Sequence, residues 1–233
     1  MKKTMAVVVM LAAALSLVSA KSSKKYSFTA GAHALAGYDF GKYGDALGNG
    51  DSKANIPLGG GLWINFPLVQ GLCIQPEVNY MYNLGQVNYD EYKVLGVSTG
   101  RKGNETRAYS SIDLGCMFTY KIESINIVAG PTVSFPISDM VSNYKMTKIS
   151  DGSEVQQDPT TTAIDTLATF GFQAGANTNV RFGLGQIVAG ARFMMDFTPT
   201  QHFNKNSNGE VTSKETLYKR MGVIAEVGYR FAL

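Results

Sequence analysis

Eight ionisable side chains stand at alternating positions within otherwise apolar segments of this 233-residue chain. They are His33, Glu77, Asp113, Arg192, Asp196, Arg220, Glu226 and Arg230. A charge on an enclosed face needs a partner of opposite sign, because an unpaired charge in a dry interior is costly. Arginine offers five donors in a fixed fork and can satisfy two carboxylates at once. The pattern therefore predicts an internal network of salt bridges, and its alternative is a selectivity constriction in a narrow pore.

Arg192 is the expected centre of this network. Counted along their segments, Arg192, Glu77, Asp113 and Glu226 fall at a similar depth, together with His33. Apart from a protonated His33, Arg192 is the only cation of that layer. We therefore expect the three carboxylates to face Arg192.

Catalysis is not indicated by the two histidines, His33 and His202. A hydrolase site needs a serine, a histidine and a carboxylate within hydrogen-bond reach. Neither histidine has an obvious serine partner, and His202 is expected to be a solvated loop residue. We therefore expect a protein that is not an enzyme, with an outer-membrane hydrolase as a minor alternative.

Two glycine patterns have structural explanations. Gly59-Gly60-Gly61 is not followed by Lys-Ser/Thr or by a helical pattern, so it does not predict a phosphate loop. Gly61-Leu62-Trp63 resembles the G-x-W motif of exported lipocalins, but that motif belongs to a first strand and this one lies on a second. A lipocalin-like carrier remains a less favoured alternative.

Neither a metal site nor a cofactor is expected from two cysteines and two histidines. Cys73 and Cys116 fall on opposite faces of their segments, which forbids a disulfide between them. The 21 Lys plus Arg against 18 Asp plus Glu leave the chain close to neutral, so nucleic-acid binding is not expected.

The first twenty residues have the organisation of a secretory signal peptide. Lys2 and Lys3 precede an apolar run over 5–18, and Val18-Ser19-Ala20 supplies the small residues before a cleavage site. The run is too short for a transmembrane helix. We expect cleavage after Ala20, export, and one domain over 21–233.

The rest of the chain alternates with a period of two, which predicts strands rather than helices. The alternating segments cover 28–40, 56–66, 72–82, 111–120, 125–137, 168–177, 187–197 and 220–231. Each has about ten residues or more, the length a tilted strand needs to cross a bilayer. Short connections alternate with long polar ones over 41–54, 85–105, 139–162 and 199–215. The fold class predicted is an all-β, eight-stranded antiparallel up-and-down transmembrane β-barrel with both termini at the short-turn end.

The two faces of these segments differ as in a membrane barrel, with apolar residues outward and polar ones inward. The polar face is rich in Gly, Ser, Thr and Asn, which fit a narrow lumen and make the eight ionisable residues a lumen charge network. Aromatic residues end the apolar face and predict interfacial girdles. The girdle residues are Tyr38, Phe40, Tyr80, Tyr82, Phe118, Tyr120 and Tyr229.

Phe170-Gly171-Phe172-Gln173-Ala174-Gly175-Ala176-Asn177 and Glu226-Val227-Gly228-Tyr229-Arg230-Phe231 resemble segments of small bacterial outer-membrane β-barrel proteins, the porin family. The resemblance implies a place in the outer membrane, among its lipids and lipopolysaccharide. It also implies a C-terminal signal for the barrel-insertion machinery, here Tyr229 and Phe231. Such proteins usually end on an aromatic residue, whereas Ala232 and Leu233 follow Phe231.

Two functions are compatible with this fold. Eight strands usually leave room only for side chains, which favours a structural or surface-interaction barrel whose long loops contact lipopolysaccharide, host surfaces or envelope proteins. The alternative is a narrow porin for small solutes or apolar molecules.

Overall fold

The computed structural model describes residues 28–41, 51–94, 97–207 and 209–232; the expected signal peptide and Leu233 lie outside them. The described chain folds into strands and contains no helix long and apolar enough to cross a membrane. The strands are β1 (Thr29–Asp39), β2 (Asp51–Val69), β3 (Leu72–Val94), β4 (Val97–Ile122), β5 (Ile125–Pro136), β6 (Met140–Lys148), β7 (Glu154–Val155), β8 (Thr160–Thr162), β9 (Thr169–Phe182), β10 (Gly185–Asp196), β11 (Thr200–Lys205), β12 (Val211–Tyr218) and β13 (Met221–Ala232).

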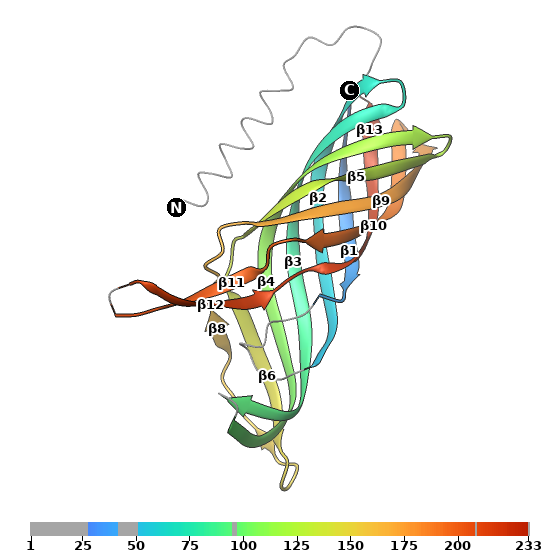
Figure 1. Cartoon of the computed structure of the whole chain (residues 1–233). Helices are drawn as coiled ribbons and strands as arrows, with labels where there is room; N and C mark the ends of the chain where they lie inside the picture. Colours follow the sequence, from blue (N-terminus) through green and yellow to red (C-terminus); the bar gives the residue numbers. More distant parts are fainter. Residues whose placement is uncertain (1–27, 42–50, 95–96, 208, 233) are drawn as a thin grey trace.

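Eight of these strands close into an antiparallel barrel. The hydrogen-bonded order is β1-β2-β3-β4-β5-β9-β10-β13, and β13 pairs with β1 to complete the ring (Figure 1). Each alternating segment of the sequence lies on one of these strands, so the predicted barrel is confirmed.

The short connections gather at one end of the barrel, which we call the turn end. Gly71 and Gly183 have φ of 81° and 59° in two of these turns, a conformation that glycine adopts without a Cβ penalty. Thr29 pairs with both Ala232 and Asn65, so the start of β1 and the end of β13 lie at the same end as the β2–β3 turn. The opposite end, which carries the long connections, is the hairpin end.

The expected long polar loops are largely wrong, because most of them are strands. β3 and β4 stay paired far beyond the barrel, from Leu84↔Ala108 to Val94↔Val97, so 85–105 is a hairpin rather than a loop. Polar residues occupy both faces there, and alternation of hydrophobicity cannot show such strands.

Two more long connections extend the same end of the molecule. β6 pairs with the outer part of β4, and β7 and β8 pair with β6. β11 and β12 form a separate two-stranded hairpin that projects sideways from the barrel (Figure 1). In the connection between β11 and β12, Gly209 has φ of 81°, a conformation that glycine adopts without a Cβ penalty.

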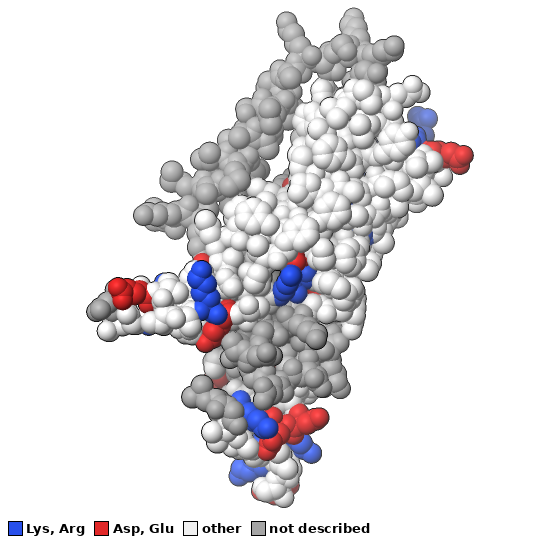
Figure 2. All heavy atoms as spheres, in the orientation of Figure 1, with Lys and Arg blue, Asp and Glu red and all other residues white. Residues whose placement is uncertain are grey.

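The barrel is inverted relative to a soluble protein. Large apolar side chains are exposed on its outer wall, including Leu62, Phe118, Ile127 and Val227, while polar residues such as Gln75, Asn79 and Asn177 are buried inside. In Figure 2 the wall between the turn tips and the hairpin end has almost no charged atoms, and charges gather beyond it. An apolar exterior around a polar interior is the architecture of an outer-membrane barrel.

Candidate functional site

A buried salt-bridge cluster crosses the middle of the lumen. Arg192 on β10 donates to both carboxylate oxygens of Glu77 on β3, at 2.8 and 2.9 Å, and to Oε2 of Glu226 on β13 at 2.5 Å. All three side chains are at most 2% exposed. One guanidinium therefore ties β10 to a neighbouring strand and to the strand across the barrel.

His33 adds a fourth member to this cluster, which we call the Arg192 cluster. Its Nε2 lies 2.7 Å from Oδ1 of Asn79, and its Nδ1 lies 3.5 Å from Oε2 of Glu226. His33 therefore connects β1 to Asn79 on β3 and to Glu226 on β13.

A second cluster lies nearer the hairpin end. Arg220 donates to Asp196 at 2.8 Å and to Asp113 at 2.7 Å, and all three side chains are nearly buried. The expected contact of Asp113 with Arg192 is therefore wrong. Asp113 on β4 is the register partner of Asn79 on β3, which is the next lumen-facing residue after Glu77 toward the hairpin end. This offset brings Asp113 to Arg220 rather than to Arg192.

An apolar layer separates the Arg192 cluster from the Arg220 cluster. Leu35, Met81, Met194 and Ile224 pack together there and are at most 5% exposed. Sequence reasoning missed this layer, although each of its residues lies an even number of positions from a predicted lumen residue on the same strand and so faces the same side. Glu226 and Ile224 are one such pair, two residues apart.

The hairpin end of the lumen is also filled. Tyr109, Met140, Ile164, Leu217 and Tyr218 form a buried cluster in which Met140 and Leu217 are fully covered. These residues come from β4, β6, β12 and the segment after β8, so the long connections fold back over the barrel opening.

Beyond the barrel, the β3–β4 hairpin has its own buried ion pair. Arg107 donates to Glu105 at 2.7 and 2.8 Å, and Tyr89 donates to the same carboxylate. Burial is the main cause that raises the pKa of Tyr89 well above its usual range, so the phenol stays protonated as a donor. These contacts, with Val87 and Met146, make the hairpin a packed stalk.

Arg230 is the one predicted network member that joins neither cluster. Its guanidinium lies over the ring of Trp63, 5.0 Å from the centroid, near the turn end. Its Nε is buried without a hydrogen-bond partner in the structure. The lumen there opens to the outside.

The predicted girdle residues lie on the outer wall. Tyr38, Phe40, Tyr80 and Tyr82 lie toward the hairpin end of the barrel wall, and Phe118, Tyr120 and Tyr229 toward the turn end. All are exposed except Tyr229, which is half-buried and donates to the carbonyl of Phe182. The ring of Tyr229 stacks edge-on against Phe231, the other residue of the predicted insertion signal.

The remaining candidates for chemistry are dispersed. Cys73 and Cys116 are both free, and Cys116 is exposed on the outer wall. His202 is not a free loop residue: its Nδ1 lies 2.9 Å from Asp165 at the base of the β11–β12 hairpin. Within the described ranges, no three metal-ligating side chains come together.

Neither the protein-family models nor the curated proteins include a match to this sequence. Solved structures with a similar fold include OprG from Pseudomonas aeruginosa, at 10% identity and TM-score 0.49, covering 90% of this chain and 98% of that one. Ail, the attachment invasion locus protein of Yersinia pestis, matches at 11% identity and TM-score 0.40, covering 88% and 99%. Neisserial surface protein A matches at 12% identity and TM-score 0.39, covering 88% and 97%.

Proposed function

We propose that this protein is a closed outer-membrane barrel that displays its long hairpins as a contact surface and has no catalytic role. Its place in the outer membrane is supported by the height of the apolar wall. From Tyr120 to Ser110 on β4, about ten residues at roughly 3.3 Å each and a tilt of about 40° cover roughly 25 Å, the height of an outer-membrane apolar band. Tyr80 bonds Ser110 through their hydroxyls at the hairpin-end edge of this band.

The observation that carries the proposal is the filling of the lumen. Along the barrel axis, the Arg192 cluster is followed by the apolar layer and then by the Arg220 cluster. The buried cluster that contains Tyr109 and Tyr218 covers them at the hairpin end. Each layer joins strands from different parts of the ring. Eight-stranded barrels have an interior just wide enough for side chains, so a solute path would require these layers to come apart.

Planar-bilayer recording tests the closed barrel. Refolded protein is added to a lipid bilayer, and we expect insertion, shown by protease protection, without unitary conductance steps. Discrete steps that change when Met81 and Met194 are both replaced by Ala would overturn the proposal in favour of a narrow pore.

A shortened hairpin tests the contact surface. Gln86 and Thr106 are directly paired, so a two-residue Asn-Gly turn can join them and remove 87–105 without changing the register of the barrel. We expect the shortened protein to refold and to lose binding to purified lipopolysaccharide, the partner that we propose for the hairpin end. A matched variant that shortens the β11–β12 hairpin shows whether the loss is specific. Unchanged binding by both variants would remove the hairpins from the proposal.

A further inference from the structure

The turn end of the lumen holds a basic vestibule, on the opposite side of the charge clusters from the hairpins. A pocket of about 380 Å³ is lined by Thr29, Lys121, Asn179, Arg181, Gln186 and Arg230, among others. A second pocket of about 240 Å³ shares Thr29, Lys121 and Arg230 and also reaches Cys73. The shared lining makes them two lobes of one space, which we call the vestibule.

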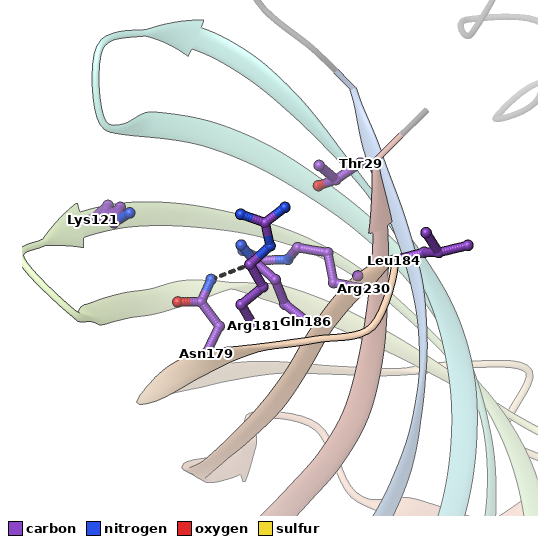
Figure 3. Close-up of a pocket in the computed structure, with 8 residues that line it drawn as sticks. Thr29, Lys121, Asn179, Arg181, Leu184, Gln186 and Arg230 are labelled. Atoms are coloured by element: carbon purple, nitrogen blue, oxygen red, sulfur yellow. Dashed lines mark hydrogen bonds between the residues drawn. The ribbon is translucent and has the colours of Figure 1, made fainter.

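Three cations from three strands line the vestibule. Figure 3 shows the side chains of Arg181 and Arg230 close together, with Lys121 on the neighbouring hairpin. No carboxylate is among the described residues that line either lobe. The contrast with the Arg192 and Arg220 clusters is sharp, because each of those arginines faces two carboxylates.

Arg230 is held in place but is not satisfied. The Trp63 ring fixes its guanidinium through a cation–π contact, and its buried Nε has no partner. Asn179 and Gln186 bond each other at 2.7 Å and form a polar wall beside it. A guanidinium held in position is a recognition element for planar or tetrahedral oxyanions.

We propose that the vestibule binds a phosphate-bearing anion from the turn-end side of the membrane. Three positive charges with no carboxylate among the described lining residues favour a group with more than one negative charge, such as a phosphate monoester or diphosphate. The volume exceeds that of several waters at about 30 Å³ each, so the site has room for phosphate with an attached group. Free phosphate esters present this chemistry, and so do lipids with a phosphomonoester headgroup, such as phosphatidic acid.

Binding is measured on the full chain refolded in phosphatidylcholine nanodiscs and titrated with inorganic pyrophosphate. Trp63 is the only tryptophan and touches Arg230, so its fluorescence reports the event. We expect saturable binding that weakens with salt, and a loss of about tenfold in affinity for Arg230→Gln, since charge-assisted hydrogen bonds are the strong ones. If Arg230→Gln does not refold, the double variant Lys121→Gln/Arg181→Gln carries the same test, because both side chains are exposed.

The matched control is Arg101→Gln/Lys102→Gln, which removes two cations at the hairpin end. An equal loss of affinity in the control, or no saturable response at all, would overturn the proposal. Nanodiscs containing phosphatidic acid distinguish the source: competition with pyrophosphate indicates a lipid headgroup, and unchanged affinity indicates a free phosphate.

Thiol chemistry gives a second readout that does not depend on Trp63. In a Cys116→Ser background, Cys73 lies in the vestibule with Lys121 and Arg230. We expect an anionic thiosulfonate to modify Cys73 several-fold faster than a cationic one, and pyrophosphate to slow it. The reverse preference would contradict a basic binding site.

Discussion

Replacing Arg192 by Met should destabilise the barrel strongly. Methionine fills much of the space of the arginine stem but cannot make the three hydrogen bonds to Glu77 and Glu226. Both carboxylates therefore stay buried without their cation. Breaking a buried ion pair costs about 3–5 kcal/mol, because the remaining charge is stranded. Gln75 and Asn79 still donate to Glu77, and Asn177 still donates to Glu226, so we expect about 3 kcal/mol, the lower end of that range.

The assay is urea unfolding of the refolded protein in lipid vesicles, followed by the fluorescence of Trp63. Lys102→Met, an exposed hairpin cation, is the matched control and should change the unfolding free energy by less than about 0.5 kcal/mol. Adding Glu77→Gln to Arg192→Met should recover about 1 kcal/mol or more, because one stranded charge disappears.

Asp113→Asn gives the sharper comparison. Asp113 is paired with Arg220 and not with Arg192. The changes in unfolding free energy of Asp113→Asn and Arg192→Met should therefore add to within about 0.5 kcal/mol, with no rescue. Rescue by Asp113→Asn as large as that by Glu77→Gln, or a stability of Arg192→Met equal to the parent, would refute the reasoning from these contacts.

Three further predictions concern other parts of the molecule. Gly31→Ala places a Cβ 2.2 Å from the Trp63 ring, so it should lower the unfolding free energy by about 1–3 kcal/mol in the same urea assay and shift the Trp63 emission. Unchanged emission would mean that the ring has room for the methyl group. The backbone N–H of Phe203 is the main cause that lowers the pKa of Asp165. The ionised carboxylate therefore stabilises the β11–β12 hairpin above the unfolded carboxyl pKa of about 3.9, and this contribution is lost as the pH falls through the lower folded pKa. Hydrogen exchange at Phe203 should rise over that pH range, and Asp165→Asn should abolish the pH dependence. An epitope inserted at Gly209 should be detected by antibody on intact cells, whereas one at Glu123 should require a permeabilised outer membrane; reversed labelling would invert the orientation of the barrel.

The barrel strands could be predicted because each has one face in lipid and one in a narrow lumen. That constraint forces a two-residue period, and the segment 125–137, for example, coincides with β5 almost to the residue. The extension of β3 and β4 could not be predicted this way. Its buried face mixes Val87 and Tyr89 with Glu105 and Arg107, so hydrophobicity does not separate the two faces there as it does in the transmembrane part.

The lumen shows the same limit at the level of single contacts. Parity placed Glu77, Arg192 and Glu226 on one face, but register decides which of them meet. Asp113 and Glu77 differ by one inward position across the β3–β4 pair, and that offset sends them to different arginines. Register is set by the turns and by the sum of neighbouring pairs, which a single strand does not contain.

The pairing of β1 with β13 has a kinetic consequence. Thr29 is paired with Ala232, so the strand pairing that closes the ring joins residues from the two ends of the described chain. Folding rates fall as contacts become more distant in sequence, since the loop between the partners must be closed first. Until β13 docks, β1 and β10 present two long unpaired edges, which are templates for pairing with other chains. Closure of this protein should therefore be its slowest folding step, and the interval before closure is when it most needs protection from aggregation.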